Sequence, residues 1–230
     1  MDDIKDQKEK SPKTIIYCPS INRVAKLHEW LLGSLGGNAW TDSSNRVFSN
    51  RIVCQFHRSI DKDLEGAVME TFPKTDSVLR VLVATIAFGI GINIPDIERV
   101  IHWGLSDSVC HYWQEIGRCA CKIPSGQAIL YPVRLCVKEN QLGQLVQQHL
   151  ENPKCVRVTF LSQFVMDGID CTILEQLSLR KTCDKDCDKS KCALCLCCSY
   201  CRTTCETAKV KNVFEHHEHV LDSIHDEPTE

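Results

Sequence analysis

Short apolar runs alternate with amphipathic helical patterns through the first half of the chain and slightly beyond it. The apolar runs are rich in β-branched and aromatic residues and have few polar interruptions, which is typical of strands buried on both faces. The predicted strands are residues 14–18, 51–56, 78–84, 100–103 and 128–131. Strand and helix in alternation predict an α/β domain, with a parallel sheet and helices on both of its faces. The pattern does not reveal the strand order.

The helical patterns between the strands carry start and stop signals. Ser20 precedes a stripe of apolar residues at helical spacing and can cap that helix, which Gly36 and Gly37 stop. Ser59 opens a second predicted helix, and a third is predicted near residues 108–121. The helices thus fall between the predicted strands, as the α/β interpretation requires.

Four regions of different character follow one another along the chain. Residues 1–13 are charged and predicted to be disordered. Residues 14–136 form the α/β domain, and residues 137–205 form a smaller module with a helical first part and a cysteine-rich end. Residues 206–230 form an acidic tail with seven acidic and two basic residues. We found no repeat of fixed period.

Composition narrows the class of protein. Hydrophobic residues make up 43% and charged residues 25% of the chain, as in ordinary globular proteins. The longest apolar run, residues 81–94, is too short to span a bilayer, so no membrane association is predicted. The N-terminus lacks the apolar core of a signal peptide, which predicts an intracellular chain. The formal net charge of −3 gives no broad basic surface for nucleic acid.

Cysteine is unusually frequent and unevenly placed. The chain has sixteen cysteines, and eight of them lie between Cys183 and Cys205. In an intracellular protein such a cluster indicates reduced thiols that bind a metal, and not a set of disulfides.

Four short motifs occur in an order that resembles the RecQ-type DNA helicases of superfamily 2. Residues 14–20 (TIIYCPS) resemble motif IV, and residues 56–58 (FHR) resemble the aromatic-histidine segment after it. Residues 83–94 (VATIAFGIGINI) resemble motif V, in which glycines let the backbone approach a phosphate closely. Residues 114–121 (QEIGRCAC) resemble motif VI. The resemblance implies a RecA-like helicase C-terminal lobe followed by a helical zinc module.

The resemblance also implies roles for individual residues, and it implies a nuclear protein of DNA repair or recombination. Motif VI residues would act at an ATP cleft, and residues of motifs IV and V would meet the phosphates of single-stranded or forked DNA. The implied residues are Gln114 and Arg118 as catalytic residues, Gly91, Asn93 and Arg118 as nucleotide-binding residues, and Ser20, His57 and Thr85 as nucleic-acid-binding residues.

This chain departs from the family pattern in two respects. The family motif VI has a second arginine where this chain has Cys121, on a helix face that we expect Gln114 and Arg118 to share. Lys122 is the next residue, but its ammonium group cannot make the bidentate contact of an arginine. The sequence also contains no phosphate-binding loop and no DExH-like strand end. We therefore expect a fragment or a degenerate copy that is impaired as an ATPase, and that uses ATP with Mg²⁺ only when a first lobe is supplied in cis or in trans.

The cysteine cluster resembles the zinc ligands of the same family. Cys155 heads a helical pattern that resembles the first-ligand helix, and Cys195, Cys198 and Cys201 follow at a Cys-x-x-Cys-x-x-Cys spacing. Four thiolates suit a structural Zn²⁺ site. The thirty-nine residues between Cys155 and Cys195 imply an insertion. Other cysteines of the run remain alternative ligands for this or a second metal, namely Cys183, Cys187, Cys192, Cys197 and Cys205.

Three functions fit these observations. The first is the C-terminal portion of a RecQ-like 3′-to-5′ DNA helicase. The second is a non-catalytic lobe that binds DNA or protein, which the missing phosphate loop and Cys121 favour. The third is an RNA helicase of the same superfamily, although the residues of motif V and the cysteines favour a DNA helicase. DNA-stimulated ATP hydrolysis by the isolated chain would exclude the second function.

Overall fold

The computed structural model describes residues 2–85, 88, 94–123, 125–132, 141–165 and 198–204. By its internal contacts the chain divides into two compact units, Met1–Gln148 and His149–Glu230. Within the described residues, no helix is both long and apolar enough to cross a membrane.

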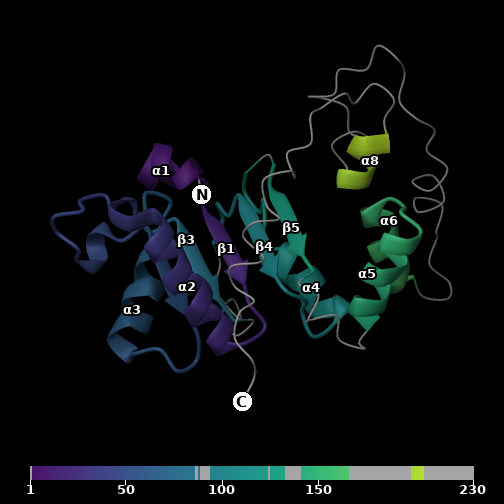
Figure 1. Ribbon diagram of the computed structural model, residues 1–230, viewed down its shortest axis with the longest axis horizontal. Helices are drawn as coiled ribbons and strands as arrows, with labels where there is room; N and C mark the ends of the chain where they lie inside the picture. The colour runs from purple at the N-terminus through teal and green to yellow at the C-terminus, as the bar shows by residue number, and fades with distance from the viewer. Residues whose placement is uncertain are drawn as a thin grey trace, which may run out of the picture. The chain divides into compact units, whose positions relative to one another are not determined.

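The first unit is built on five parallel strands (Figure 1), which confirms the predicted sheet. Their order across the sheet is β2-β3-β1-β4-β5, so β1 lies at the centre between β3 and β4. Each strand is within three residues of its predicted start. The strands are β1 (Thr14–Tyr17), β2 (Val53–Phe56), β3 (Val81–Ala84), β4 (Arg99–Trp103) and β5 (Gln127–Tyr131).

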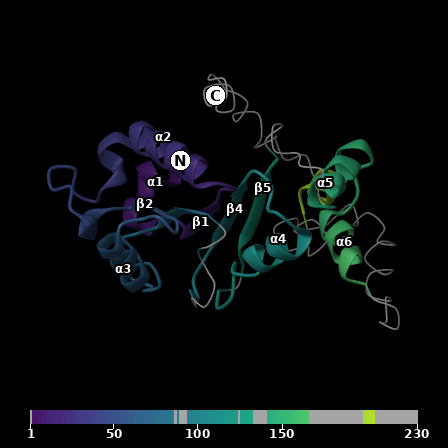
Figure 2. The same ribbon diagram turned by 90° about the horizontal axis from the view of Figure 1, so that it is seen from below.

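Helices cover both faces of the sheet, as predicted. Helix α2 (Ile21–Leu35) lies on one face, and α3 (Lys62–Thr71) and α4 (Val109–Ile116) lie on the other (Figure 2). Alternate strand residues divide into two cores accordingly: Ile16 packs with the α2 residues, whereas Ile15 packs with those of α3. A short 3-10 helix, η2 (Gly36–Ala39), follows α2, and another, η3 (Phe48–Asn50), precedes β2.

Side-chain caps set where two of these helices begin, and one of them differs from the prediction. The Ser20 hydroxyl accepts a hydrogen bond from the backbone N–H of Arg23, as expected of the cap of α2. The second helix begins after Asp61, and not at Ser59, because the Asp61 carboxylate accepts hydrogen bonds from the N–H groups of Asp63 and Leu64. An aspartate followed by acidic residues in the first turn complements the helix dipole.

The N-terminus differs from the expected disorder. Residues 2–10 form α1 (Asp2–Gln7) and a 3-10 helix, η1 (Lys8–Lys10). Ile4 is 8% exposed and belongs to the core on the α2 side of the sheet, and Asp3 pairs with Arg99 of β4. One apolar side chain among charged residues is too weak a pattern to predict this docking.

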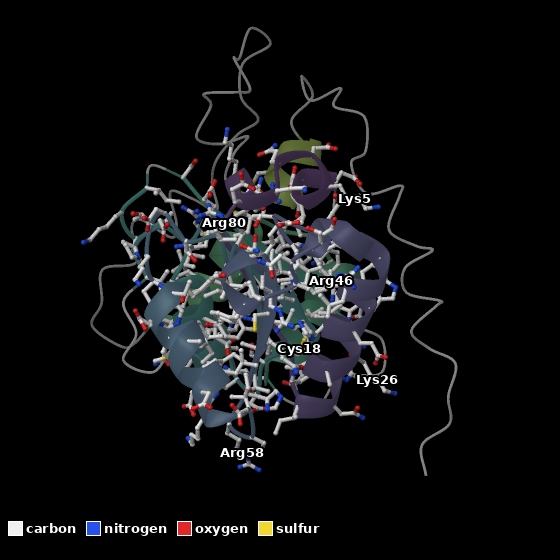
Figure 3. All side chains as sticks on the ribbon, turned by 90° about the vertical axis from the view of Figure 1, so that its left-hand side faces the viewer. Lys5, Cys18, Lys26, Arg46, Arg58 and Arg80 are labelled. Atoms are coloured by element: carbon white, nitrogen blue, oxygen red, sulfur yellow. The ribbon has the colours of Figure 1, made fainter. Side chains whose placement is uncertain are left out.

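A buried charged cluster lies where the strands begin. Lys13 is fully buried, and its Nζ lies 2.8 Å from the Asp96 carboxylate and 2.8 Å from the Lys74 carbonyl. Burial lowers the pKa of Lys13, and the bond to Asp96 opposes that effect. Nearby, Arg80 donates to the Ser11 carbonyl at 2.7 Å. Figure 3 shows Arg80 and Arg58 at opposite ends of the domain, so this cluster is remote from the strand ends that carry the predicted site.

We expect Lys13→Ala to lower the free energy of unfolding by about 3–5 kcal/mol, because it leaves a mostly buried carboxylate without its cation. Lys13→Met, which keeps the volume of the stem, should cost less than Lys13→Ala because it leaves no cavity. Urea unfolding of both variants measures the difference. The control Lys62→Ala removes an exposed ion pair with Glu65 and should cost less than about 1 kcal/mol. Equal losses of unfolding free energy in Lys13→Ala and Lys62→Ala would show that the buried Lys13–Asp96 pair stabilises the protein no more than the exposed pair does.

The remaining described elements are helical, as expected for residues after 136. Helix α5 (Gln141–Glu151) crosses the division between the units, and α6 (Val156–Leu161), η5 (Ser162–Phe164) and α8 (Ser199–Thr204) belong to the second unit. In α5, Leu142, Leu145 and Val146 recur at helical spacing and are buried. Leu150, in the last turn of the helix, is 68% exposed.

Candidate functional site

The three predicted nucleic-acid-binding residues follow three adjacent strands of the sheet. Ser20 follows β1, His57 follows β2, and Thr85 follows β3. Because the strands are parallel, their carboxyl ends meet at one edge. Backbone hydrogen bonds join the ends of neighbouring strands there: Thr85 N–H donates to the Phe56 carbonyl at 3.2 Å, and Cys18 N–H donates to the Ala84 carbonyl at 2.8 Å. The fold thus brings these three residues to the same edge.

The three side chains differ in how open they are. Ser20 is exposed and Thr85 is half-buried, so both hydroxyls lie near the surface. His57 is only 9% exposed, and its Nδ1 has no hydrogen-bond partner within the described part of the chain. Arg58, beside it, is exposed. Ser20, Thr85 and Arg58 therefore supply the accessible donors at this edge.

The motif VI segment (residues 114–121) begins on α4 but leaves the helix early. The helix ends at Ile116, so Gln114, Arg118 and Cys121 do not share one helix face, and that expectation is wrong. Ala120 has a φ of 60°, in the left-handed region. Its N–H donates to the Ile97 carbonyl at 2.9 Å, which ties the turn to the start of β4. A left-handed residue cannot continue a right-handed helix.

Cys121, which we predicted to stand where the motif VI pattern has its second arginine, lies at the end of this turn and is an exposed thiol. The Cys121 Sγ lies 3.4 Å from the carbonyl oxygens of both Gly117 and Arg118. Lys122 is also exposed, and its backbone N–H donates to the Pro95 carbonyl at 3.0 Å. Gln114 is exposed and Arg118 is half-buried, so both of these motif VI side chains have polar groups near the surface.

A buried tyrosine at the end of the central strand belongs to the core cluster against which Ile116 and Cys119 of the motif VI segment pack. Tyr17 ends β1 and is 2% exposed, and its hydroxyl donates to the Phe88 carbonyl at 3.3 Å. Burial raises the pKa of the Tyr17 phenol, and the positive charge of Arg118 opposes that rise. Tyr17 therefore connects the central strand to motifs V and VI.

A buried polar cluster adjoins Tyr17 under α4. His102 Nε2 lies 2.7 Å from Glu115 Oε2, and the Ser106 hydroxyl donates to the same oxygen at 2.5 Å. His102 is 1% and Glu115 is 6% exposed. Burial raises the pKa of the Tyr112 phenol to about 12, and the negative charge of Glu115 adds to that rise. Sequence reasoning missed this cluster, although a glutamate next to the apolar stripe of α4 was an available signal.

The structure brings together three of the four predicted zinc ligands. The sulfur atoms of Cys155, Cys198 and Cys201 all lie within 4.8 Å of one another, and those of Cys155 and Cys198 are 4.0 Å apart. Cys155 precedes α6, Cys198 precedes α8, and Cys201 lies in α8. The N–H of Cys201 donates to the Cys198 sulfur at 3.5 Å. The fourth predicted ligand, Cys195, lies outside the described residues, as do Gly91 and Asn93.

The three thiols suit a tetrahedral metal site. With a Zn–S bond of about 2.3 Å, sulfurs at tetrahedral angles are about 3.8 Å apart, close to the 4.0 Å found here. Burial and the neighbouring thiols of Cys198 and Cys155 raise the pKa of Cys201. A divalent cation offsets that cost, because it deprotonates the thiols that coordinate it.

Comparison with known proteins places the chain in a family. Residues 1–122 match the family model described as "Helicase conserved C-terminal domain". The chain belongs to that family, and its parallel sheet is the RecA-like lobe of a helicase. The lobe is of the RecQ type within superfamily 2, as its relatives show.

Three curated relatives illustrate the likeness. The chain is 30% identical over 123 residues to the ATP-dependent DNA helicase RecQ of Haemophilus influenzae, covering 54% of this chain and 17% of the relative. It is 38% identical over 128 residues to the ATP-dependent DNA helicase Q-like 2 of Arabidopsis thaliana (50% and 18%). It is 26% identical over 196 residues to the mouse bifunctional 3'-5' exonuclease/ATP-dependent helicase WRN (74% and 12%). The chain spans less than a fifth of the length of each of these relatives.

Proposed function

We propose that this chain is the C-terminal portion of a RecQ-like 3′-to-5′ DNA helicase, which binds single-stranded or forked DNA and contributes motifs IV, V and VI to an ATP-dependent unwinding site. The observation that carries the proposal is the meeting of Ser20, His57 and Thr85 at one edge of the sheet, in a chain of this family. We place its proposed action in the nucleus, in DNA repair or recombination.

The proposed DNA contact uses donors near the surface at the strand ends. The Ser20 and Thr85 hydroxyls and the Arg58 guanidinium can donate to phosphate oxygens, which fix a protein on a strand without reading its sequence. His57, which is mostly buried, would support this edge from inside and contact DNA only through its outer atoms.

The proposed ATP site needs a second lobe opposite the motif VI segment. Gln114 and Arg118 would face the phosphates of ATP with Mg²⁺, Arg118 as the residue that stabilises charge on the transferring group. Gly91 and Asn93 would line the same cleft from motif V. A first helicase lobe, supplied in cis or in trans, would bring the phosphate loop and the Mg²⁺ ligands.

Zinc is the proposed structural metal of the second unit. Cys155, Cys198 and Cys201 would hold it with Cys195 as the fourth ligand, and four thiolates would close the site to chemistry. Its contribution would be to fold the module, since the described part of that unit has few buried apolar side chains.

A second candidate function is a non-catalytic lobe that binds DNA or protein. The exposed thiol of Cys121, where the family has an arginine, favours it. Binding of DNA without ATP hydrolysis, even with a first lobe present, would select this candidate.

We expect Thr85→Ala to weaken binding of the chain to a labelled forked DNA by about 10- to 100-fold, because a hydrogen bond to a charged phosphate is worth about 1.5–3 kcal/mol. Fluorescence anisotropy at fixed ionic strength measures the affinity. The control Thr71→Ala changes a half-buried threonine at the end of α3 and should leave affinity unchanged. Single-stranded RNA serves as competitor: an RNA preference, or equal binding by Thr85→Ala and the unmodified chain, would contradict the proposed DNA site.

A further inference from the structure

The face of the sheet that α2 covers is more open at β4 and β5 than at its centre. Helix α2 lies over the β2 side of the sheet, and β4 and β5 lie beyond it (Figure 2). Trp103 of β4 pairs in register with Tyr131 of β5, so both side chains lie on one face. Trp103 packs against the core cluster that includes the α2 residues, which places the pair on the α2 face. Both rings are half-buried, whereas every residue of β3 is buried.

The two rings form an aromatic pair at the carboxyl end of the sheet. Their centroids are 5.6 Å apart, and their planes are inclined by 55°. Trp103 is the last residue of β4, and Tyr131 is the last residue of β5. The N–H of Gly104 donates to the Tyr131 carbonyl at 3.0 Å, so the backbone holds the two strand ends together. Accessible aromatic rings that a sheet fixes in place are surfaces on which the bases of a single strand can stack.

A guanidinium without a counter-charge lies at the neighbouring strand end. Arg23 stands in the first turn of α2, three residues after Ser20, and is half-buried. Within the described part of the chain, its guanidinium has no hydrogen-bond partner and forms no ion pair with a carboxylate. A guanidinium matches the geometry of phosphate oxygens, which accept two parallel hydrogen bonds from it. Arg23 is therefore a suitable phosphate ligand.

Gly104 connects this cation to the aromatic pair. It directly follows Trp103, and its φ of 107° lies in the left-handed region that favours glycine. A side chain at this position would begin 3.2 Å from the Pro19 ring and 3.8 Å from Arg23 Nη1. The glycine thus lets the β4 end approach the β1 end closely, and it leaves the surface beside the Arg23 guanidinium free of a further side chain.

We propose that Trp103, Tyr131 and Arg23 form a contact site for single-stranded DNA, in which bases stack on the two rings and Arg23 binds a phosphate beside them. This inference deepens the proposed function and rests on it. It extends the proposed phosphate contacts of Ser20 and Thr85 along the same edge of the sheet, from β1 to β4 and β5. The rings hold bases of any sequence, because every base has a face that stacks.

The first test compares a labelled oligodeoxythymidine with a strand of the same length that carries no bases. In Trp103→Leu, affinity for the oligodeoxythymidine should fall roughly 5- to 150-fold, the loss found per stacked base, and affinity for the abasic strand should stay unchanged. Fluorescence anisotropy at fixed ionic strength measures both. Trp30→Leu is the matched control, because Trp30 is also half-buried and packs against the same core cluster. It should bind both strands as the unmodified chain does.

The second test leaves the sheet intact and also covers the case in which Trp103→Leu does not fold. Arg23→Gln should lower the slope of log affinity against log salt concentration by about 0.7, the value for one phosphate contact on a single strand. Lys5→Gln removes the same charge from an exposed side chain at the end of the domain that carries Arg80 (Figure 3). That control should leave the slope unchanged.

The outcomes separate this site from the proposed function. Unchanged oligodeoxythymidine affinity in Trp103→Leu, equal weakening on both strands, or an equal loss in Trp30→Leu would overturn the stacking role. An unchanged salt slope in Arg23→Gln would overturn the phosphate contact. In each of these cases the unmodified chain still binds DNA, so the proposed helicase function stands. No binding of DNA by the unmodified chain would overturn both proposals together.

Discussion

Replacing Cys198 with serine should remove one zinc ion per chain and unfold the described part of the second unit. Cys198 lies 4.0 Å from Cys155, and its sulfur also receives the N–H of Cys201, so it contacts both of the other clustered cysteines. Structural zinc contributes about 10–16 kcal/mol of apparent folding free energy in small modules at neutral pH. Few buried apolar side chains in the described part of this unit are available to replace it.

Metal content per chain, measured by mass spectrometry of the purified protein, gives the first readout, and circular dichroism before and after a chelator gives the second. Cys110→Ser is the matched control, since Cys110 is an exposed free thiol on α4 of the first unit. It should keep its zinc and its spectrum. Unmodified protein without zinc, or a Cys198→Ser protein that keeps one ion per chain, would refute the site.

The same measurement identifies the fourth ligand. Cys195→Ser should lose zinc as Cys198→Ser does if the Cys-x-x-Cys-x-x-Cys spacing sets the ligands. If Cys195→Ser keeps its zinc, serine variants of the five alternative cysteines should be measured in turn. More than one ion per unmodified chain would indicate a second site among them.

The sheet was predictable because buried parallel strands are read from local pattern alone. Residues 81–84 are buried throughout, and apolar runs placed all five strands, although β5 is only partly buried. Strand order was not predictable, since it depends on which strands meet across the sheet. Helix ends were less predictable because local contacts set them: Asp61 took the role expected of Ser59, and α4 ends at Ile116, five residues before the predicted end at 121.

The candidate site was predictable to the extent that it follows strand ends. Ser20, His57 and Thr85 come together because each follows a parallel strand, and the three described cysteines come together across a long insertion. The cluster around Tyr17 was not predictable in the same way. Tyr17 and His102 are far apart in sequence and read as ordinary strand residues, and only the β1–β4 register makes them neighbours.

Cys121→Arg should raise DNA-stimulated ATP hydrolysis by about 10³- to 10⁵-fold in a protein that carries a RecQ-type first lobe fused to this chain. The position accepts an arginine without repacking, because the Cys121 side chain is exposed and its sulfur lies against the carbonyl oxygens of Gly117 and Arg118 in the preceding turn. Lys122 does not replace it, since an ammonium lacks the planar fork of a guanidinium. The quantity measured is kcat at saturating forked DNA.

Two variants decide whether such a gain comes from the cleft. Cys110→Arg adds the same charge at an exposed thiol on α4 and should leave kcat unchanged. Arg118→Gln in the Cys121→Arg background should abolish the gain, because two arginines that act on one phosphoryl group are strongly non-additive. If Cys121→Arg raises kcat no more than Cys110→Arg does, the thiol at position 121 is not the cause of impaired ATP hydrolysis. The lobe then functions through binding, as the non-catalytic candidate holds.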